Sequence, residues 1–261
     1  MQEHEITTAI EALERQNTFI IQQLRHITKT EANIEQRIIP TLIPLEHPSY
    51  GVLVEVAIDQ RIQALAQQLV DSNIENPILI PILDGALPFF SKFYNFLKTN
   101  HPTFRFQFST TSASSYIDEK SSGTLNIKAA PKVPLGARNL VLVDDVLDTG
   151  TTLQTLADEF NNTYGANSVA CMVLINKQQE RKNFSISQVF VGLEIDKEAF
   201  LLGFGMDWCE LFRNVPYIAK MGDVRPTDAE KNFLKLQKGL NETLSKNLLA
   251  IRSLNTQLQE L

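Results

Sequence analysis

The stretch Val141–Leu153, VLVDDVLDTGTTL, contains the most specific signal in the chain. Its apolar start indicates a buried strand, which runs into the adjacent acids Asp144 and Asp145 and then a third acid, Asp148. Thr-Gly-Thr-Thr follows and leads into the helical pattern LQTLADEF. A small turn that feeds a helix N-terminus is a typical binding place for an anion. The stretch therefore predicts a strand, an anion-binding turn and a helix, with three carboxylates beside the turn.

The rest of the middle region, from about residue 45 to 226, alternates between strand and helix patterns. We expect strands at 77–83, 104–110, 139–146, 168–175, 188–195 and 199–205, and helices at 60–70, 86–99 and 153–165. Continuous apolar strands joined by helices predict an α/β fold with a parallel sheet covered on both faces. Ligands of such sheets bind beyond the carboxyl ends of the strands. The Ser- and Thr-rich stretch 109–132 has few apolar anchors and is interpreted as a long functional or disordered loop.

Two long amphipathic helices are expected outside this region, so we divide the chain into an N-terminal arm (1–39), a central domain (40–226) and a C-terminal arm (227–261). Apolar residues recur every three, four or seven positions up to about residue 38, and Pro40 then stops the pattern. A capping box, Thr227 to Glu230, starts the second helix.

The apolar positions of both arms fall on heptads, and each seam is interrupted by one asparagine, Asn17 or Asn247. One antiparallel register places the two asparagines opposite each other, and a buried Asn pair fixes register. The layers of that register are Ile10 with Leu254, Leu13 with Ile251, Asn17 with Asn247, Ile20 with Leu244 and Leu24 with Leu240. We therefore predict an antiparallel coiled-coil hairpin. The alternative is that each helix packs on the core or on its own copy in another subunit.

Composition narrows the partners. The chain has 261 residues and a net charge of −6, which argues against a general nucleic-acid or anionic-membrane binder. No apolar run approaches the roughly 20 residues that span a bilayer, and the acidic, amphipathic start is unlike a signal peptide. The two cysteines, Cys171 and Cys209, suggest neither a disulfide framework nor a metal site. The expected location is the cytoplasm.

Three acids beside an anion-binding turn fit a sugar phosphate. Carboxylates only accept hydrogen bonds, so Asp144 and Asp145 suit the hydroxyls of a ribose. The helix-terminal amides and the hydroxyls of Thr149, Thr151 and Thr152 suit a phosphate, and Mg²⁺ would balance the charge. A plain helix N-cap is the simpler alternative. A Walker loop is excluded because GxxxxGK[ST] is absent, and a haloacid-dehalogenase-like phosphatase would need two aspartates two residues apart.

The stretch resembles the phosphoribosyl-pyrophosphate motif of type I phosphoribosyltransferases. ILDGALPFF, SSYIDEKSSG, VLINKQQER and AFLLGFGMDWCELFR extend the resemblance to the hypoxanthine-guanine branch, over roughly residues 45 to 222. It implies a type I fold with a small purine-binding hood. It also implies an enzyme that transfers ribose 5-phosphate from phosphoribosyl pyrophosphate to a 6-oxopurine in purine salvage, acting as a dimer or tetramer.

The resemblance also implies roles for single residues. Asp144 and Asp145 would hold the ribose hydroxyls directly or through Mg²⁺, and Asp148 would exchange a proton with purine N7. The phosphoribosyl pyrophosphate would be bound by Asp84, Gly85, Asp144, Asp145, Asp148, Thr149, Gly150, Thr151, Thr152 and Arg213. The purine would be bound by Lys177, Phe200, Leu201 and Asp207, with Asp207 also near a second metal, and Ser115 and Tyr116 would form the lid. Arg181 would lie on the pyrophosphate side.

Three positions depart from the family pattern. Thr151 replaces a frequent Lys or Arg, Asp144 replaces Glu, and Asp84 stands where Lys is common, so turnover is expected to differ from that of relatives. A regulator that kept the nucleotide site, and a phosphoribosyltransferase for xanthine or a pyrimidine, are the competing functions. Hypoxanthine, guanine and xanthine differ at C2, which the sequence does not resolve.

Overall fold

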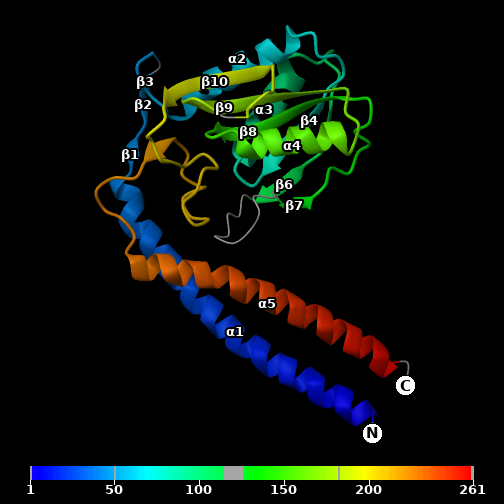
Figure 1. The fold of residues 1–261 in the computed structure, drawn as a ribbon. Coiled ribbons are helices and arrows are strands. Elements are labelled where there is room, and N and C mark those ends of the chain that lie inside the picture. The colour runs from blue at the N-terminus through cyan, green and yellow to red at the C-terminus, as the bar shows by residue number, and fades with distance from the viewer. Residues whose placement is uncertain (1, 50, 115–125, 182, 260–261) are drawn as a thin grey trace. The chain divides into compact units, whose positions relative to one another are not determined.

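The computed structural model describes residues 2–49, 51–114, 126–181 and 183–259, and it forms two compact units (Figure 1). Residues 43–221 make up one unit, and the terminal segments 1–42 and 222–261 together make up the other. In the described chain, no helix is long and apolar enough to cross a membrane.

The central unit is an α/β fold built on a mainly parallel sheet. Its larger elements are α2 (Glu55–Val70), β4 (Ile78–Leu83), α3 (Leu87–Asn100), β8 (Asn139–Leu147), α4 (Thr151–Asn162), β9 (Ser168–Gln178) and β10 (Val189–Asp196). The short strands β5 (Gln107–Phe108), β6 (Thr111–Ser114) and β7 (Asn126–Ala129) complete the sheet. The strand order is β10-β9-β8-β4-β6-β7, with β5 also on β4, and only the β6–β7 pair is antiparallel.

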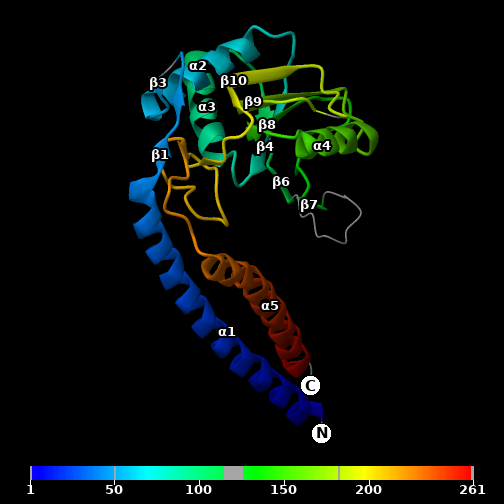
Figure 2. The same cartoon turned by 60° about the vertical axis from the view of Figure 1, so that its left-hand side comes forward.

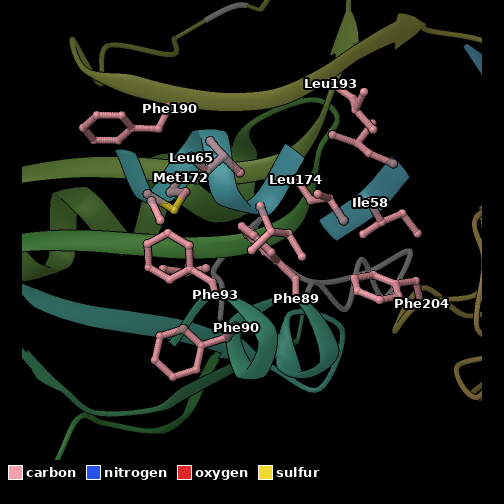
Figure 3. Close-up of a cluster of buried hydrophobic side chains, with 14 of the residues drawn as sticks. Ile58, Leu65, Phe89, Phe90, Phe93, Met172, Leu174, Phe190, Leu193 and Phe204 are labelled. Atoms are coloured by element: carbon pink, nitrogen blue, oxygen red, sulfur yellow. The ribbon is translucent and has the colours of Figure 1, made fainter. Parts of the chain in front are cut away.

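Both faces of this sheet are buried, as the continuous apolar strands predict. Helices α2 and α3 cover one face and α4 covers the other (Figures 1 and 2). Successive residues of β8 divide between the two cores: Val141 and Val143 pack with α2 and α3, whereas Leu140 and Leu142 pack with α4. Figure 3 shows the first core, in which Phe89, Phe93 and Leu65 meet Met172 and Leu174 of β9. The sheet is thereby fixed between two packed layers, and its carboxyl edge can carry exact side-chain geometry.

The predicted strand at 104–110 is wrong in extent. Only Gln107–Phe108 pairs with the first residues of β4, and the chain pairs again at β6 with the last ones. Pro81 lies at the interruption; it has no amide hydrogen, and proline is tolerated in a sheet only where no ladder bond is required. The stretch 109–132, expected to be a loop, instead contributes the β6–β7 hairpin, so its few apolar residues did not preclude strands.

A small antiparallel sheet carries the segment that matches the purine-site pattern. It consists of β1 (Ile43–Pro44), β12 (Ala219–Lys220) and β11 (Leu201–Leu202), and a separate hairpin joins β2 (Glu46–His47) to β3 (Gly51–Val52). The predicted strand 199–205 is reduced to β11 because Gly203, Phe204 and Gly205 all have positive φ. A side chain at Gly203 would overlap the Tyr217 carbonyl, so this turn depends on glycine.

The terminal unit consists of α1 (Gln2–Ile38), the short 3₁₀ turn η1 (Ile39–Thr41) and α5 (Asp228–Gln259). Helices α1 and α5 lie against each other in this unit. The buried Asn247 Nδ2 donates to Asn17 Oδ1 at 2.9 Å and to Gln16 Oε1 at 3.1 Å. At the other end, Arg37 binds Glu230 at 2.9 Å. These two contacts run in opposite senses along the helices, so the pair is antiparallel, and the asparagine layer is the one that the heptads predict.

The capping box at the start of α5 is confirmed. The Thr227 amide donates to Glu230 Oε2 at 2.7 Å, and the Glu230 amide donates to Thr227 Oγ1 at 3.2 Å.

Candidate active site

The predicted anion turn lies between β8 and α4. Gly150 is the residue before α4 and has φ +80°, and a Cβ there would press on the Phe184 ring, so the turn requires glycine. The N-cap residue, Gly150, has no side chain, so the start of α4 has no side-chain cap. The hydroxyls of Thr149 and Thr151 lie 3.1 Å apart, and Thr152 follows in the first turn. Amides and hydroxyls are therefore gathered at the positive end of α4, which suits a phosphate.

Asp148 and Lys177 form an ion pair across the carboxyl ends of β8 and β9. Lys177 Nζ lies 2.6 Å from Asp148 Oδ2, and Gln179 donates to the other carboxylate oxygen. Lys177 is almost buried, whereas half of the Asp148 side chain is exposed. Burial raises the pKa of Asp148, but the hydrogen bonds from Lys177 and Gln179 and the charges of Lys177 and Arg181 outweigh it, so its pKa is lowered. Asp148 is ionised at neutral pH and faces solvent.

Asp144 and Asp145 end the apolar part of β8 and lie side by side. Burial raises the pKa of Asp144 well above its usual value, and the neighbouring Asp145 charge raises it further. Burial also raises the pKa of Asp145, although the Val146 amide, donating at 2.8 Å, and the charge of Arg213 oppose the rise. Two carboxylates that share a desolvated place disfavour each other's ionisation. A cation or ligand hydroxyls would relieve this cost.

The loop after β11 brings an acid and a base to the same region. Arg213 lies 2.8 Å from Asp207 and also binds Glu210, and its Nη1 donates to the Gly205 carbonyl at 2.6 Å. Gly205 in turn abuts the backbone of Gly85, where a side chain would not fit. The Arg213 Nε is buried and has no hydrogen-bond partner among the described residues. Arg213 therefore holds the loop that carries Asp207, and its charge also acts on Asp145.

The first loop, after β4, is close to the acids as well. A Cβ on Gly85 would overlap the Asp145 carboxylate, so glycine is needed for this approach. Asp84, the departure from the family pattern, is exposed. The peptide bond between Leu83 and Asp84 is cis.

The expected purine-stacking residue Phe200 comes just before β11 of the small antiparallel sheet, and Leu201 begins that strand. Phe200 is 53% exposed, so it is not a core residue, whereas Leu201 is buried. Within the described chain, no hydrogen bond or ring contact joins Phe200 to Lys177. The lid residues Ser115 and Tyr116 lie outside the described residues.

Arg181, expected on the pyrophosphate side, binds protein groups around the Asp148–Lys177 pair. Its donors reach the backbone carbonyls of Leu147, Asp148 and Lys177 and the side chain of Asn176. Sequence reasoning also missed Gln179, the second donor to Asp148. A signal for it exists, because residues two apart on an extended chain point to the same side, and Gln179 is two residues beyond Lys177.

The donor set is compatible with magnesium. Within the described ranges, no three His, Cys, Asp or Glu side chains gather as a metal-binding group. Mg²⁺ does not need one, because it commonly takes one or two carboxylates and fills the remaining positions with water and substrate phosphates. The desolvated pair Asp144 and Asp145 offers such carboxylates.

Comparisons with known proteins agree with this arrangement. Residues 54–208 match the family model described as "Phosphoribosyl transferase domain". The hypoxanthine-guanine phosphoribosyltransferase of Bacillus subtilis is 30% identical over 177 residues, which cover 67% of this chain and 94% of that protein. The enzyme of the same name from Streptococcus pneumoniae is 34% identical over 154 residues, covering 59% and 81%.

A solved structure gives the same result. The hypoxanthine phosphoribosyltransferase from Staphylococcus aureus superposes with a TM-score of 0.57 at 26% identity, covering 65% of this chain and 89% of that one. The match includes the parallel sheet and its flanking helices. The chain therefore belongs to the phosphoribosyltransferase family, in its hypoxanthine-guanine branch.

Proposed function

We propose that this protein transfers ribose 5-phosphate from phosphoribosyl pyrophosphate to N9 of a 6-oxopurine, hypoxanthine or guanine, as an enzyme of purine salvage. The N9–C1′ bond forms, the bond from C1′ to the pyrophosphate oxygen breaks, and a proton leaves the base. The family membership and the relatives' names support this reaction.

The observation that carries the proposal is the ion pair between Asp148 and Lys177. When a 6-oxopurine binds as its N7–H tautomer, the N7–H donor and the O6 acceptor are neighbours on one edge of the base, and N9 is free to attack. Asp148 and Lys177 are 2.6 Å apart and half of Asp148 is open to solvent, so the pair has the spacing of that edge. Lys177 moves its hydrogen bond to O6, and Asp148 then takes the proton at N7 as general base. Adenine presents a 6-amino donor to the Lys177 donor, so the site discriminates against it.

The rest of the site is assigned to the sugar phosphate. Residues 148–152, with the amides at the start of α4 and the hydroxyls of Thr149, Thr151 and Thr152, hold the 5-phosphate. Asp144 and Asp145 accept from the ribose hydroxyls and favour the positive charge that develops on the sugar. Asp84, Gly85 and Arg213 face the pyrophosphate.

The remaining purine contacts are assigned to the segment around β11 and to the expected lid residues. Phe200 stacks on the base, and its exposure supports this role. The backbone of Leu201 meets the base edge, and Asp207 lies nearby. Ser115 and Tyr116 close over the reacting centre and exclude water.

Magnesium is the proposed cofactor. Asp144 and Asp145 would hold it on the ribose side, and Asp207 would hold a second ion or its waters. Mg²⁺ would supply positive charge to neutralise the pyrophosphate leaving group. The exposed carboxylate of Asp84 makes this neutralisation more important here than in relatives that carry lysine at this place.

We further infer that α1 and α5 form an antiparallel coiled-coil hairpin within one chain. The buried Asn17–Asn247 bond and the Arg37–Glu230 pair support it. Association of the chain into a dimer or tetramer is part of the same proposal, and sedimentation equilibrium measures it.

The test is incubation with phosphoribosyl pyrophosphate, Mg²⁺ and one base at a time. We expect nucleotide and pyrophosphate with hypoxanthine or guanine and none with adenine. Absence of product with every base tested would reject the enzyme and favour a nucleotide-binding regulator. Product with xanthine or a pyrimidine alone would reject the proposed substrate but keep the reaction.

A further inference from the structure

Arg181 makes an unusual set of hydrogen bonds behind the candidate site. Its Nε donates to the Asp148 carbonyl at 2.7 Å, and its Nη2 donates to the Leu147 carbonyl at 3.1 Å. The same Nη2 reaches Asn176 Oδ1 at 2.6 Å and the Lys177 carbonyl at 2.5 Å. One edge of the guanidinium thus holds the backbone of both residues of the Asp148–Lys177 pair.

The position of these acceptors explains why such a connection is needed. The last β8–β9 pair is Leu147 with Asn176, so the Asp148 carbonyl lies beyond the ladder. From this point β9 continues beside β10, with Lys177 opposite Ile195, while the other chain turns away into α4. Beyond the Leu147–Asn176 pair the sheet does not hold together the two strand ends that carry the ion pair, so another contact has to connect them.

The chain after Arg181 also supports the phosphate turn. The Arg181 guanidinium lies 6.0 Å from the centre of the Phe184 ring, and that ring occupies the space a side chain on Gly150 would need. The Ser185 amide donates to Gln154 Oε1 of α4 at 2.7 Å. Arg181, Phe184 and Ser185 therefore contact the back of the turn and the helix that follows it.

We propose that Arg181 is a positioning residue: by binding the backbone of Leu147, Asp148 and Lys177, it sets the spacing between the proton-accepting carboxylate and the ammonium that meets the base. This inference rests on the proposed function. In this role Arg181 binds protein groups behind the ion pair, whereas a pyrophosphate-binding arginine would direct its donors to the substrate.

Arginine is suited to this role by its shape. Its planar fork presents donors from two different nitrogens in fixed directions, whereas lysine presents one ammonium that cannot span four acceptors. A misplacement of about 1 Å at a reacting centre can cost roughly 100-fold in rate. The charge has a second effect, because Arg181 is among the groups that lower the pKa of Asp148.

Three variants separate shape from charge. Arg181→Lys keeps the charge and loses the fork, and Arg181→Met loses both. Arg138→Lys is the matched control, because Arg138 also donates to a backbone carbonyl, that of Asn76 at 3.4 Å, but on the exposed surface away from the site. Each variant is measured for kcat, for the KM of both substrates, for inhibition by pyrophosphate, for melting temperature and for the pH dependence of kcat/KM.

We expect Arg181→Lys to lower kcat about 10- to 100-fold with an unchanged acid limb of the pH profile. Arg181→Met should lower kcat at least as much and move the acid limb to higher pH, because a cation that favours ionised Asp148 is gone. Inhibition of both Arg181 variants by pyrophosphate should equal that of wild type. The control Arg138→Lys should equal wild type in every measurement. Carbon NMR titration of the Asp148 carboxyl should show the same rise of its pKa in Arg181→Met. This measurement does not depend on activity.

Weaker pyrophosphate inhibition with an unmoved acid limb would overturn the inference and make Arg181 a direct ligand. A lower melting temperature with unchanged kcat would overturn it in favour of a purely structural role. Absence of activity in the wild-type protein would reject the proposed function. The NMR titration would still decide whether Arg181 acts on Asp148.

Discussion

Asp148 has both of its carboxylate oxygens engaged before any ligand is present. Lys177 and Gln179 donate to them, and these bonds lower the pKa of the group that we propose as the base. A carboxylate with a lowered pKa is reliably ionised but weakly basic. In the proposed reaction, transfer of the Lys177 hydrogen bond to purine O6 would remove one of these bonds, so binding of the correct base would itself make Asp148 a better proton acceptor.

Replacement of Asp148 by asparagine tests its role as a base. Asp148→Asn keeps the shape and can still hydrogen-bond, but it cannot accept the proton. We expect kcat to fall about 10²- to 10⁴-fold with little change in the affinity for phosphoribosyl pyrophosphate, measured by steady-state kinetics and calorimetry. Asp158→Asn, which alters an exposed aspartate of α4 that accepts from Gln154, is the control. A near-normal kcat in Asp148→Asn would reduce Asp148 to a turn residue.

Replacement of Lys177 by methionine tests the other half of the pair. A lost hydrogen bond to a charged group is worth about 1.5–3 kcal/mol, so purine kcat/KM should fall roughly 10- to 100-fold. The pKa of Asp148 should rise, which moves the acid limb of kcat/KM to higher pH. Lys92→Met is the control, because it removes the ion pairs that Lys92 of α3 makes with Glu55 and Asp59 of α2, outside the candidate site. An unchanged purine affinity with a large loss of stability would indicate that Lys177 is structural.

The effect of the pair on stability has a defined sign. The folded-state pKa of Asp148 is lowered, so the stabilisation is present above the unfolded pKa, about 3.9, and disappears as the pH falls through the folded value. Half of the Asp148 side chain is exposed, so solvent screens this contribution. We therefore expect Lys177→Met to change the melting temperature little at pH 7.

Part of the site follows from the sequence and part does not. Asp148, Gly150 and Lys177 can be predicted because strand ends and turn chemistry place them at one edge of a parallel sheet. The role of Arg181 cannot, because two of its acceptors are the backbone carbonyls of Leu147 and Asp148, more than thirty positions away, and carbonyls leave no trace in the residue types. The need for glycine at positions 85 and 205 could be predicted only in part, because the closeness of Gly85 to Gly205 depends on tertiary packing.

At the scale of elements, α5 begins with a reciprocal cap that also binds α1. Thr227 and Glu230 satisfy each other's amides, and Glu230 in addition accepts from Arg37 at 2.9 Å. Burial raises the pKa of Glu230, but the Thr227 and Arg37 bonds outweigh it and lower the pKa. The cap therefore stabilises the start of α5 at neutral pH and weakens as the pH falls through that lowered value.

Removal of the cap should destabilise the helix pair. Thr227→Ala loses the hydroxyl that accepts from the Glu230 amide, which typically costs about 1 kcal/mol. We expect a lower thermal midpoint of the helical circular-dichroism signal. Thr256→Ala is the control, because Thr256 lies inside α5 and bonds only back to the Arg252 carbonyl. Equal midpoints for Thr227→Ala and the control would show that the cap is not what starts α5.

The strands show which signals sequence can carry. The apolar runs within β4, β8, β9 and β10 could be predicted because both faces of the sheet are covered, so most of their residues are apolar. Strand β5 lies within the strand predicted at 104–110 but is shorter, and β6 and β7 were not predicted. The break between β5 and β6 lies opposite Pro81 of β4, a non-local feature that the composition of 104–132 does not reveal.

For the molecule as a whole, the chain enters and leaves the central unit through neighbouring strands. Strand β1 follows the α1 segment and β12 precedes the α5 segment, and the two strands pair antiparallel, with Ile43 opposite Lys220. The ends of both long helices are thus tied to one small sheet by short connections. This connectivity favours pairing of α1 and α5 from the same chain, because one chain already brings them close together and the loop-closure cost is small.

Disulfide trapping tests both the register and the number of chains, with Cys171 and Cys209 replaced beforehand. The Asn17–Asn247 contact sets a register that places Ile10 beside Leu254, about 20 Å along the helices from Leu240. Cysteines at 10 and 254 should therefore form a disulfide in the monomer-sized species at low protein concentration, and cysteines at 10 and 240 should not. Linkage of the second pair instead would overturn the register. A dimer-sized product that grows with concentration would mean that the helices pair between chains.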